Sequence, residues 1–309
     1  MKKIANYDTY DYDYSTYWNK RAYEHGAEEI VLNKILKTSK GRWFLDIGGS
    51  FGRLSNTYSD KYTNPVIVDY SLKTLQRNKK ELKHRYPNIE LIAANAYNLP
   101  FRENTFDGAL MVRVLHHIEN PKDCISEIFR TLDSNAIYIQ EYANKVHIKA
   151  VIRAFIKFDF SIFNTQPYQQ PDKHHYEGTK EGSKVLFLNY HPKYISEIFS
   201  NVGLRIENKY GCSFLRSAFL KKTFKTKILL SIEELLQNIL SWSNISPSIF
   251  LKSTPIKKSD KENVSTESIL DILVCPECKK KLAISGNTAK CEKCNKQYQK
   301  IEDIWDFRI

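Results

Sequence analysis

Residues 42–142 alternate short apolar runs with stretches of helical spacing, and this rhythm restricts the fold of the 309-residue chain more than any other feature. The runs expected to form strands are residues 43–47, 64–69, 89–94, 106–112 and 136–139. Between them, Ser71 can cap a helix over 71–86, and Pro121 can open another that reaches about Leu132. Strands that alternate with helices predict an α/β fold whose parallel sheet is covered on both faces.

The rest of the chain divides into segments of different character. A helix over 192–202, a strand over 204–209, a helix over 225–242 and a strand over 248–252 continue the α/β pattern. Residues 144–190 interrupt it near the sheet edge where open α/β sheets bind ligands, so we expect them to form a substrate lid. The expected limits are an N-terminal helical cap over 1–40, an α/β domain over 41–254 with the insertion at 143–190, a linker over 255–268 and a cysteine-rich unit over 269–309.

The first expected strand leads into a glycine-rich turn. Residues 48–52 hold three glycines and follow Asp46, and small residues there let the backbone pass close to a nucleotide-like ligand. The helix expected after the turn would offer that ligand unpaired N–H groups. Asp69 ends the second strand about 20 residues after Gly48, where a carboxylate can accept both hydroxyls of a ribose. On the glycines alone, a dinucleotide-binding fold and a tight turn without a ligand are alternatives.

Three details favour S-adenosylmethionine as the ligand. Asp46 precedes the glycines, the pair Asn95 and Ala96 follows the third strand, and residues 112–118 continue the fourth. Over about residues 17–252 the chain resembles the class I S-adenosylmethionine-dependent methyltransferases, especially the group related to the quinone-biosynthesis methyltransferases. The resemblance implies an enzyme with a Rossmann-like, doubly wound, seven-stranded and mostly parallel sheet. It also implies S-adenosylmethionine as co-substrate.

The same resemblance implies a set of cofactor-binding residues. The turn would wrap the amino-acid part of the cofactor, Asp46 would approach its amino group, Asp69 would hold the ribose, and the remaining residues would border the adenine and the methionine. The full set is Asp46, Gly48, Gly49, Ser50, Gly52, Asp69, Tyr70, Asn95, Ala96, Arg113 and Leu115. Ser50 stands where the family usually has glycine and Asn95 where it often has aspartate, so these two contacts depart from the pattern. Residues 17–24 would form a helix that either caps the cofactor or packs on the sheet.

Methyl transfer requires alignment of donor and acceptor, and it needs a general base only where the acceptor holds a proton of high pKa. The catalytic residue is therefore unknown from the sequence. The candidate bases are His116, His117, Glu141, Tyr142, His174, His175 and His191. Tyr168, His174, His175 and Tyr176 in the insertion could shape an acceptor pocket. Packing and capping roles are the alternative for each of these side chains.

Four of the six cysteines lie within the last forty or so residues. Cys275, Cys278, Cys291 and Cys294 follow the pattern C-x2-C-x12-C-x2-C, which is typical of a closed, tetrahedral and structural zinc site. Disulfides or free thiols are the alternative. This C-terminal, β-rich segment resembles the small zinc-ribbon proteins that activate tRNA, rRNA and release-factor methyltransferases, here fused in one chain. The resemblance implies a partner-facing role for the ribbon, toward RNA or protein.

The leading hypothesis is methyl transfer to a small molecule, either a metabolite or a lipophilic, quinone-like acceptor. The net charge of +12 and the ribbon support tRNA or rRNA as the alternative acceptor, although a lysine-rich composition also explains the charge. A further alternative is a scaffold that binds S-adenosylmethionine without activity. No signal peptide and no run of about 18 apolar residues occur, so we expect a cytoplasmic protein without integral membrane association.

Overall fold

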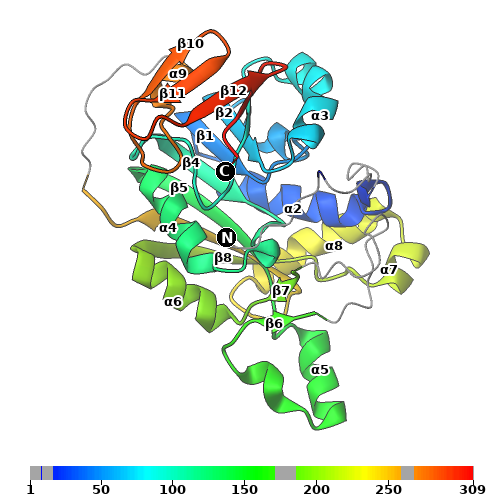
Figure 1. The fold of residues 1–309 in the computed structure, drawn as a ribbon. Coiled ribbons are helices and arrows are strands. Elements are labelled where there is room, and N and C mark those ends of the chain that lie inside the picture. The colour runs from blue at the N-terminus through cyan, green and yellow to red at the C-terminus, as the bar shows by residue number, and fades with distance from the viewer. Residues whose placement is uncertain (1–7, 9–16, 171–185, 259–267, 309) are drawn as a thin grey trace.

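The computed structural model describes residue 8 and residues 17–170, 186–258 and 268–308 (Figure 1). Within these residues one sheet of eleven strands runs in the order β10-β11-β12-β13-β3-β2-β1-β4-β5-β9-β8. The strands of its α/β part are β1 (Gly41–Ile47), β2 (Tyr62–Asp69), β3 (Glu90–Ala93), β4 (Phe106–Met111), β5 (Leu132–Ala143), β8 (Leu204–Cys212) and β9 (Ser248–Pro255). The C-terminal strands are β10 (Leu282–Ser285), β11 (Thr288–Cys291), β12 (Gln297–Ile301) and β13 (Ile304–Asp306).

The part of the sheet from β3 to β8 confirms the Rossmann-like expectation. β3, β2, β1, β4 and β5 pair in parallel, whereas β9 runs antiparallel to both β5 and β8. β1, the central strand, is mostly apolar because helices cover both faces of the sheet, and its residues 43–47 are buried. The carboxyl ends of β1, β2, β3 and β4 therefore meet at one edge, where the predicted cofactor residues lie.

Helices cover both faces of this sheet. Phe44 packs with α2 (Ala22–Ile35) on one face, and its neighbour Leu45 packs with α4 (Pro121–Thr131) and α6 (Pro192–Val202) on the other. The remaining helices are α3 (Leu72–Arg85), α5 (Ile148–Lys157), α7 (Ala218–Thr223), α8 (Thr226–Ile239) and α9 (Ile269–Ile272). None of the helices among the described residues is long and apolar enough to cross a membrane.

The expected start signals are found at α3 and α4. The Ser71 hydroxyl accepts a hydrogen bond from the Thr74 N–H at the start of α3, and Pro121 occupies the first turn of α4. Gly203 ends α6 with a φ of 93°, a conformation that glycine adopts at little cost. The prediction of a helix directly after the glycine-rich turn is wrong. Only a short 3-10 helix, η3 (Ser55–Thr57), forms there, because its serine, asparagine and threonine favour turns over α-helices.

The insertion after β5 leaves the body of the molecule. α5 and the 3-10 helix η5 (Phe160–Phe163) project at the lower end of the view in Figure 1, and the chain returns through the pair β6 (Tyr168–Gln169) and β7 (Leu188–Asn189). The Lys145 ammonium closes the base of this projection by donating to the carbonyls of Asn164 (2.9 Å) and Gln166 (2.7 Å).

The C-terminal ribbon continues the sheet of the α/β domain. β13 pairs in parallel with β3, with Trp305 opposite Ile92, and the Phe307 N–H donates to the Ala93 carbonyl at 2.7 Å. Trp305 and Phe307 are buried in the same apolar core as Leu45 of β1. The ribbon is therefore joined to the edge of the sheet through both backbone pairing and a shared core.

Candidate functional site

The glycine-rich turn after β1 has a left-handed backbone at three positions. φ is 73° at Gly48, 50° at Ser50 and 70° at Gly52. The Gly48 N–H donates to the Val68 carbonyl at 2.7 Å, which holds the turn beside β2. A Cβ at Gly48 would lie 2.2 Å from Cγ2 of Val114, which follows β4, so the close approach of Val114 requires glycine there. Ser50 adopts the left-handed conformation with its side chain in place.

Asp69 joins the end of β2 to that turn. One carboxylate oxygen accepts a hydrogen bond from the Ser50 N–H at 3.0 Å, and the other accepts from the Ser71 N–H at 2.8 Å. Burial raises the pKa of Asp69 to about 6, while the two N–H donors oppose the shift. The residue predicted to hold a ribose thus lies beside the turn predicted to hold the amino-acid part of the same ligand.

Asp46 lies beneath the turn and is buried. Its carboxylate accepts a hydrogen bond from the Tyr58 hydroxyl at 2.8 Å, and burial raises its pKa to about 7. A Cβ at Gly49 would lie 2.7 Å from the Asp46 carboxylate carbon, so the absence of a side chain keeps the backbone against this acid. Tyr58 has no place in the sequence prediction, because nothing in the local pattern pairs it with Asp46.

Asn95 and Ala96 follow β3 and border the same edge. The Ala94 N–H donates to the Asp69 carbonyl at 3.0 Å, which fixes the end of β3 beside the end of β2. The Asn95 side-chain oxygen accepts from the Tyr97 N–H at 2.9 Å. Tyr70 follows Asp69, so the predicted ribose and adenine positions are contiguous in the structure.

Arg113 turns its side chain toward the N-terminal helix. Its Nε donates to Glu28 at 2.7 Å, and the second oxygen of Glu28 accepts from Arg53 at 2.6 Å. Burial alone would raise the pKa of Glu28, but the Arg113 and Arg53 guanidiniums hold that pKa below its usual range. The sequence prediction missed Glu28. The available signal was an acidic residue on the same helical face as Val31 and Ile35.

The remaining predicted cofactor residue, Leu115, is fully buried in the main core. Arg113 itself has a φ of 63°, and its N–H donates to the Glu141 carboxylate at 2.9 Å. Glu141 also accepts from the Ser248 hydroxyl, so this candidate base supports the chain after β4. The Leu115 side chain belongs to the core, and its main-chain carbonyl accepts from the Tyr190 hydroxyl at 2.9 Å, so its contact with a ligand stays a prediction.

His116 and His117 lie in the 3-10 helix η4 (Leu115–His117), and both are buried. The His116 ring lies against that of Phe187, with 4.3 Å between ring centres, and the His117 Nδ1 lies 2.7 Å from the Leu186 carbonyl. Burial lowers the pKa of His116 well below its ordinary value and that of His117 to about 4. Both rings are therefore neutral near neutral pH.

The other candidate bases differ in their placement. Tyr142 is buried in the main core, and burial raises the pKa of its hydroxyl. His191 caps α6 by accepting from the Lys193 N–H at 3.2 Å. Tyr168 is exposed in β6. His174, His175 and Tyr176 lie outside the described residues, so their roles stay predictions.

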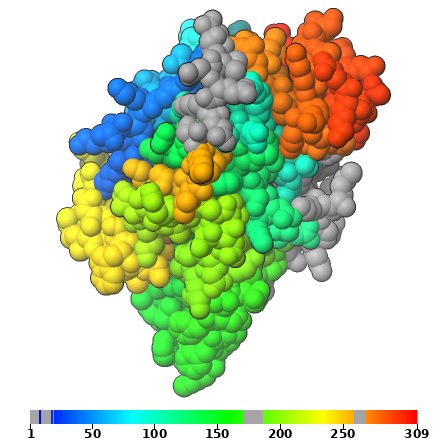
Figure 2. Space-filling model, turned by 90° about the vertical axis from the view of Figure 1, so that its left-hand side faces the viewer, coloured from blue at the N-terminus to red at the C-terminus, as the bar shows by residue number. Residues whose placement is uncertain are grey.

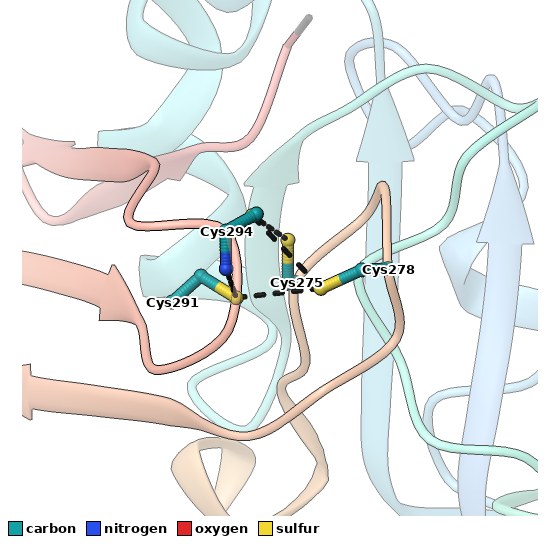
Figure 3. A group of neighbouring side chains, drawn as sticks. All are labelled: Cys275, Cys278, Cys291 and Cys294. Atoms are coloured by element: carbon teal, nitrogen blue, oxygen red, sulfur yellow. Dashed lines mark hydrogen bonds between the residues drawn. The ribbon is translucent and has the colours of Figure 1, made fainter.

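The four clustered cysteines converge as their spacing predicts (Figure 3). Their sulfur atoms all lie within 4.8 Å of one another, with separations of 3.4 Å for Cys278–Cys291 and 3.6 Å for Cys275–Cys294. A tetrahedron with metal–sulfur bonds of about 2.3 Å has edges of about 3.8 Å, so the cluster fits a zinc ion. The N–H groups of Lys293 and Cys294 both point at the Cys291 sulfur, which favours a thiolate there.

Comparison with known proteins places this site in a recognised domain. The family model described as "Methyltransferase domain" matches residues 45–139. An uncharacterised protein of Methanocaldococcus jannaschii, MJ0638, is 37% identical over 138 residues, which are 44% of this chain and 56% of that protein. The demethylmenaquinone methyltransferase of Paenarthrobacter aurescens is 32% identical over 38% of this chain and 45% of its own length. The chain thus spans about half the length of the curated relatives it matches.

Solved structures share the fold. A putative S-adenosylmethionine-dependent methyltransferase from Listeria monocytogenes superposes with a TM-score of 0.53 at 14% identity, over 75% of this chain and 97% of that one. A chain from the complex between the Haloferax volcanii Trm112 methyltransferase activator and a putative methyltransferase gives 0.52 at 11% identity, over 82% and 99%. The protein therefore contains a methyltransferase domain of Rossmann-like fold, with a four-cysteine cluster consistent with a zinc ribbon.

Proposed function

We propose that the chain transfers a methyl group from S-adenosylmethionine to a small-molecule acceptor. The observation that supports this most is the joint placement of the glycine-rich turn and Asp69 within the segment that the methyltransferase family model matches. Asp69 accepts from the Ser50 N–H of the turn and from the Ser71 N–H at the start of α3, and it keeps carboxylate lone pairs for the ribose hydroxyls.

The other predicted residues have matching roles in this proposal. Residues 48–52 surround the amino-acid part of the co-substrate above Asp46, Tyr70 covers the adenine, and Asn95 and Ala96 border its edge. The bound sulfonium supplies an electrophilic methyl group. The protein then contributes orientation of the acceptor and exclusion of water.

The acceptor that we favour is a metabolite or a lipophilic, quinone-like compound. Two relatives are named demethylmenaquinone methyltransferases, and their similarity to this chain is distant. The insertion at 143–190 extends from the end of β5 and is the segment best placed to close over an acceptor, as a lid. The neutral imidazole of His117 lies where this insertion returns, through its contact with Leu186.

We further propose that the cysteine cluster binds one structural zinc ion. All four positions of a tetrahedral site would be filled by Cys275, Cys278, Cys291 and Cys294, which leaves no position for a reactant. Cysteines must stay reduced to bind zinc, and a reducing compartment keeps them so, which supports the cytoplasm as the location.

Binding and turnover can be tested separately. Titration calorimetry of the full chain with S-adenosylhomocysteine should give one site, and Asp69→Asn should weaken it at least tenfold. Asp60→Asn is the matched control, because Asp60 is an exposed aspartate paired with Lys61. Incubation with methyl-labelled S-adenosylmethionine and a metabolite and lipid extract should then label a small molecule. Failure to bind in calorimetry would contradict the proposal outright.

RNA is the second candidate acceptor. It is favoured by the net charge of +12 and by the solved complex that contains a methyltransferase activator. Label that enters tRNA or rRNA but no small molecule would favour this alternative, in which the ribbon would contact RNA or a protein partner. Binding of S-adenosylhomocysteine without any methyl transfer would favour the third alternative, a scaffold that binds the cofactor without activity.

A further inference from the structure

The insertion exposes a cluster of large apolar side chains. On α5, the residues Phe155 and Ile156 are 58% and 73% exposed, and Phe158, directly after the helix, is 85% exposed. Phe160 and Phe163 are also exposed, and the rings of Phe155 and Phe160 pack with each other at 5.3 Å between centres. We call residues 146–170 the projection. Figures 1 and 2 both show it as a narrow extension from the body of the molecule.

The charges on the projection are arranged beside its apolar face. Lys149, Arg153 and Lys157 recur every four residues along α5, next to the exposed row of Ile148, Ile152 and Ile156. Asp159 is the one acidic residue between positions 144 and 170 of the sequence. Ala154 is the buried residue of α5, whereas the apolar row and the basic row are both exposed.

A second apolar row lies on α8. Ile228, Ile232, Leu235 and Ile239 are all exposed, and their spacing of four and three residues places them on one side of the helix. The exposed Trp242 continues this row in the turn that follows α8. The opposite side, with Leu229, is buried against the body. We call the exposed row the α8 stripe. Lys222, Lys225 and Lys227 are exposed in the segment that leads into it.

The two apolar features meet at their ends. The Ile148 N–H, at the start of α5, donates to the Ile245 carbonyl at 2.9 Å, three residues after Trp242. Trp242 is 78% exposed at this junction. The Lys209 ammonium donates to the Trp242 carbonyl at 2.8 Å, which places a cation at the same junction. The end of the α8 stripe and the base of the projection therefore form one continuous region.

We propose that the projection and the α8 stripe dock onto the surface of an anionic lipid bilayer. Amphipathic helices that carry phenylalanine on one side and lysine or arginine beside it lie in the bilayer interface, where the cations contact anionic headgroups. Tryptophan is favoured at the same depth, which suits the exposed Trp242. A narrow, convex extension can enter the interface while the body remains in water, whereas a protein partner would have to supply a matching groove.

This inference goes beyond the proposed methyl transfer and does not depend on it. Docking would bring the insertion, which follows β5 at the cofactor edge of the sheet, to the phase in which lipophilic compounds dissolve. Vesicle binding is measured without S-adenosylmethionine, so its failure would leave the methyl-transfer proposal untouched.

Co-sedimentation of the full chain with vesicles tests the proposal. We expect binding to phosphatidylglycerol-containing vesicles, at least tenfold weaker binding to pure phosphatidylcholine vesicles, and loss of the difference at high salt. Ile156→Ser should weaken binding about tenfold, because it removes a side chain that would leave water. Ile256→Ser is the matched control. Ile256 is 63% exposed and lies just beyond the opposite end of β9 from the projection, so this variant should bind like the original chain.

A second variant keeps the test independent of α5 stability. Phe158 has a φ of 51°, a conformation that asparagine tolerates well, so Phe158→Asn should fold normally and still lose several-fold in vesicle binding. The proposal is overturned if vesicles of both compositions leave the protein in the supernatant. It is equally overturned if the original chain and Ile156→Ser bind alike. A dimer in solution that Ile156→Ser dissolves, without vesicle binding, would assign the surface to a second copy of the chain.

Discussion

The guanidinium of Arg308 donates a hydrogen bond to the main-chain carbonyl of Tyr70 across 3.4 Å and lies 5.9 Å from the centre of the Tyr70 ring. It also pairs with Asp8, whose carboxylate accepts from the Ser71 hydroxyl at 2.6 Å. Arg308 follows β13, so the last strand of the ribbon reaches the loop after Asp69. The C-terminal end of the chain thus contacts Tyr70, the residue predicted to border the adenine.

Arg308→Ala should therefore weaken S-adenosylhomocysteine binding while the fold persists. The loss of a charge-assisted contact is worth about 1 kcal/mol, which corresponds to roughly fivefold in the dissociation constant. Arg85→Ala is the control, because Arg85 forms an exposed ion pair with Glu81 on α3. Calorimetry on the original chain and both variants measures the effect. Equal affinities throughout would show that the contact does not support the site.

Removal of zinc should lower the stability of the whole molecule, because Trp305 and Phe307 are buried in the core of the α/β domain. We expect about one zinc ion per chain, its loss in Cys275→Ser, and a lower melting temperature of that variant. Cys124→Ala is the control for metal content, because Cys124 is buried away from the cluster beside Ala96. Elemental analysis and thermal melting provide the two measurements. A zinc-free chain with an unchanged melting temperature would contradict the coupling.

Sequence reasoning succeeded where the signal was local. The glycine-rich turn, Asp69 and the four cysteines each follow from spacing within a short window, and the structure brings each set together. It failed where partners are distant. The pairing of Trp305 with Ile92 and the ion pair of Arg113 with Glu28 join segments whose separation no periodicity encodes. The helix expected after the glycine-rich turn failed for a local reason, since Ser55, Asn56 and Thr57 favour turns over an α-helix.

Gly48→Ala should damage the cofactor site more than its backbone strain alone explains. The new Cβ would lie 2.2 Å from Val114 Cγ2, so overpacking adds about 1–3 kcal/mol to the strain of a left-handed residue. Gly286→Ala isolates the strain. Gly286 has a φ of 57°, and nothing lies within 4 Å of its added Cβ. Denaturant unfolding should show the larger loss for Gly48→Ala, which should also abolish S-adenosylhomocysteine binding. Similar losses in both variants would mean that Val114 moves away without cost.

S-adenosylhomocysteine binding should weaken as the pH falls through the pKa of Asp69. Burial raises this pKa to about 6, so the carboxylate is mostly ionised above that value and mostly protonated below it. Protonation removes lone pairs needed by the ribose hydroxyls and by the Ser50 and Ser71 N–H groups, which disfavours the bound form. If binding requires the ionised acid, the dissociation constant should rise about tenfold from about pH 7.5 to about pH 5.

Two variants separate Asp69 from the other buried acid. Asp69→Asn should bind weakly and lose the part of the pH dependence centred near 6. Asp46→Asn should keep that part, because its own pKa of about 7 is raised by burial at a different position. Calorimetric titrations of the three proteins across this range decide the matter. Parallel pH profiles for Asp69→Asn and the original chain would remove Asp69 from the ribose site, since a group that no longer titrates cannot produce the dependence.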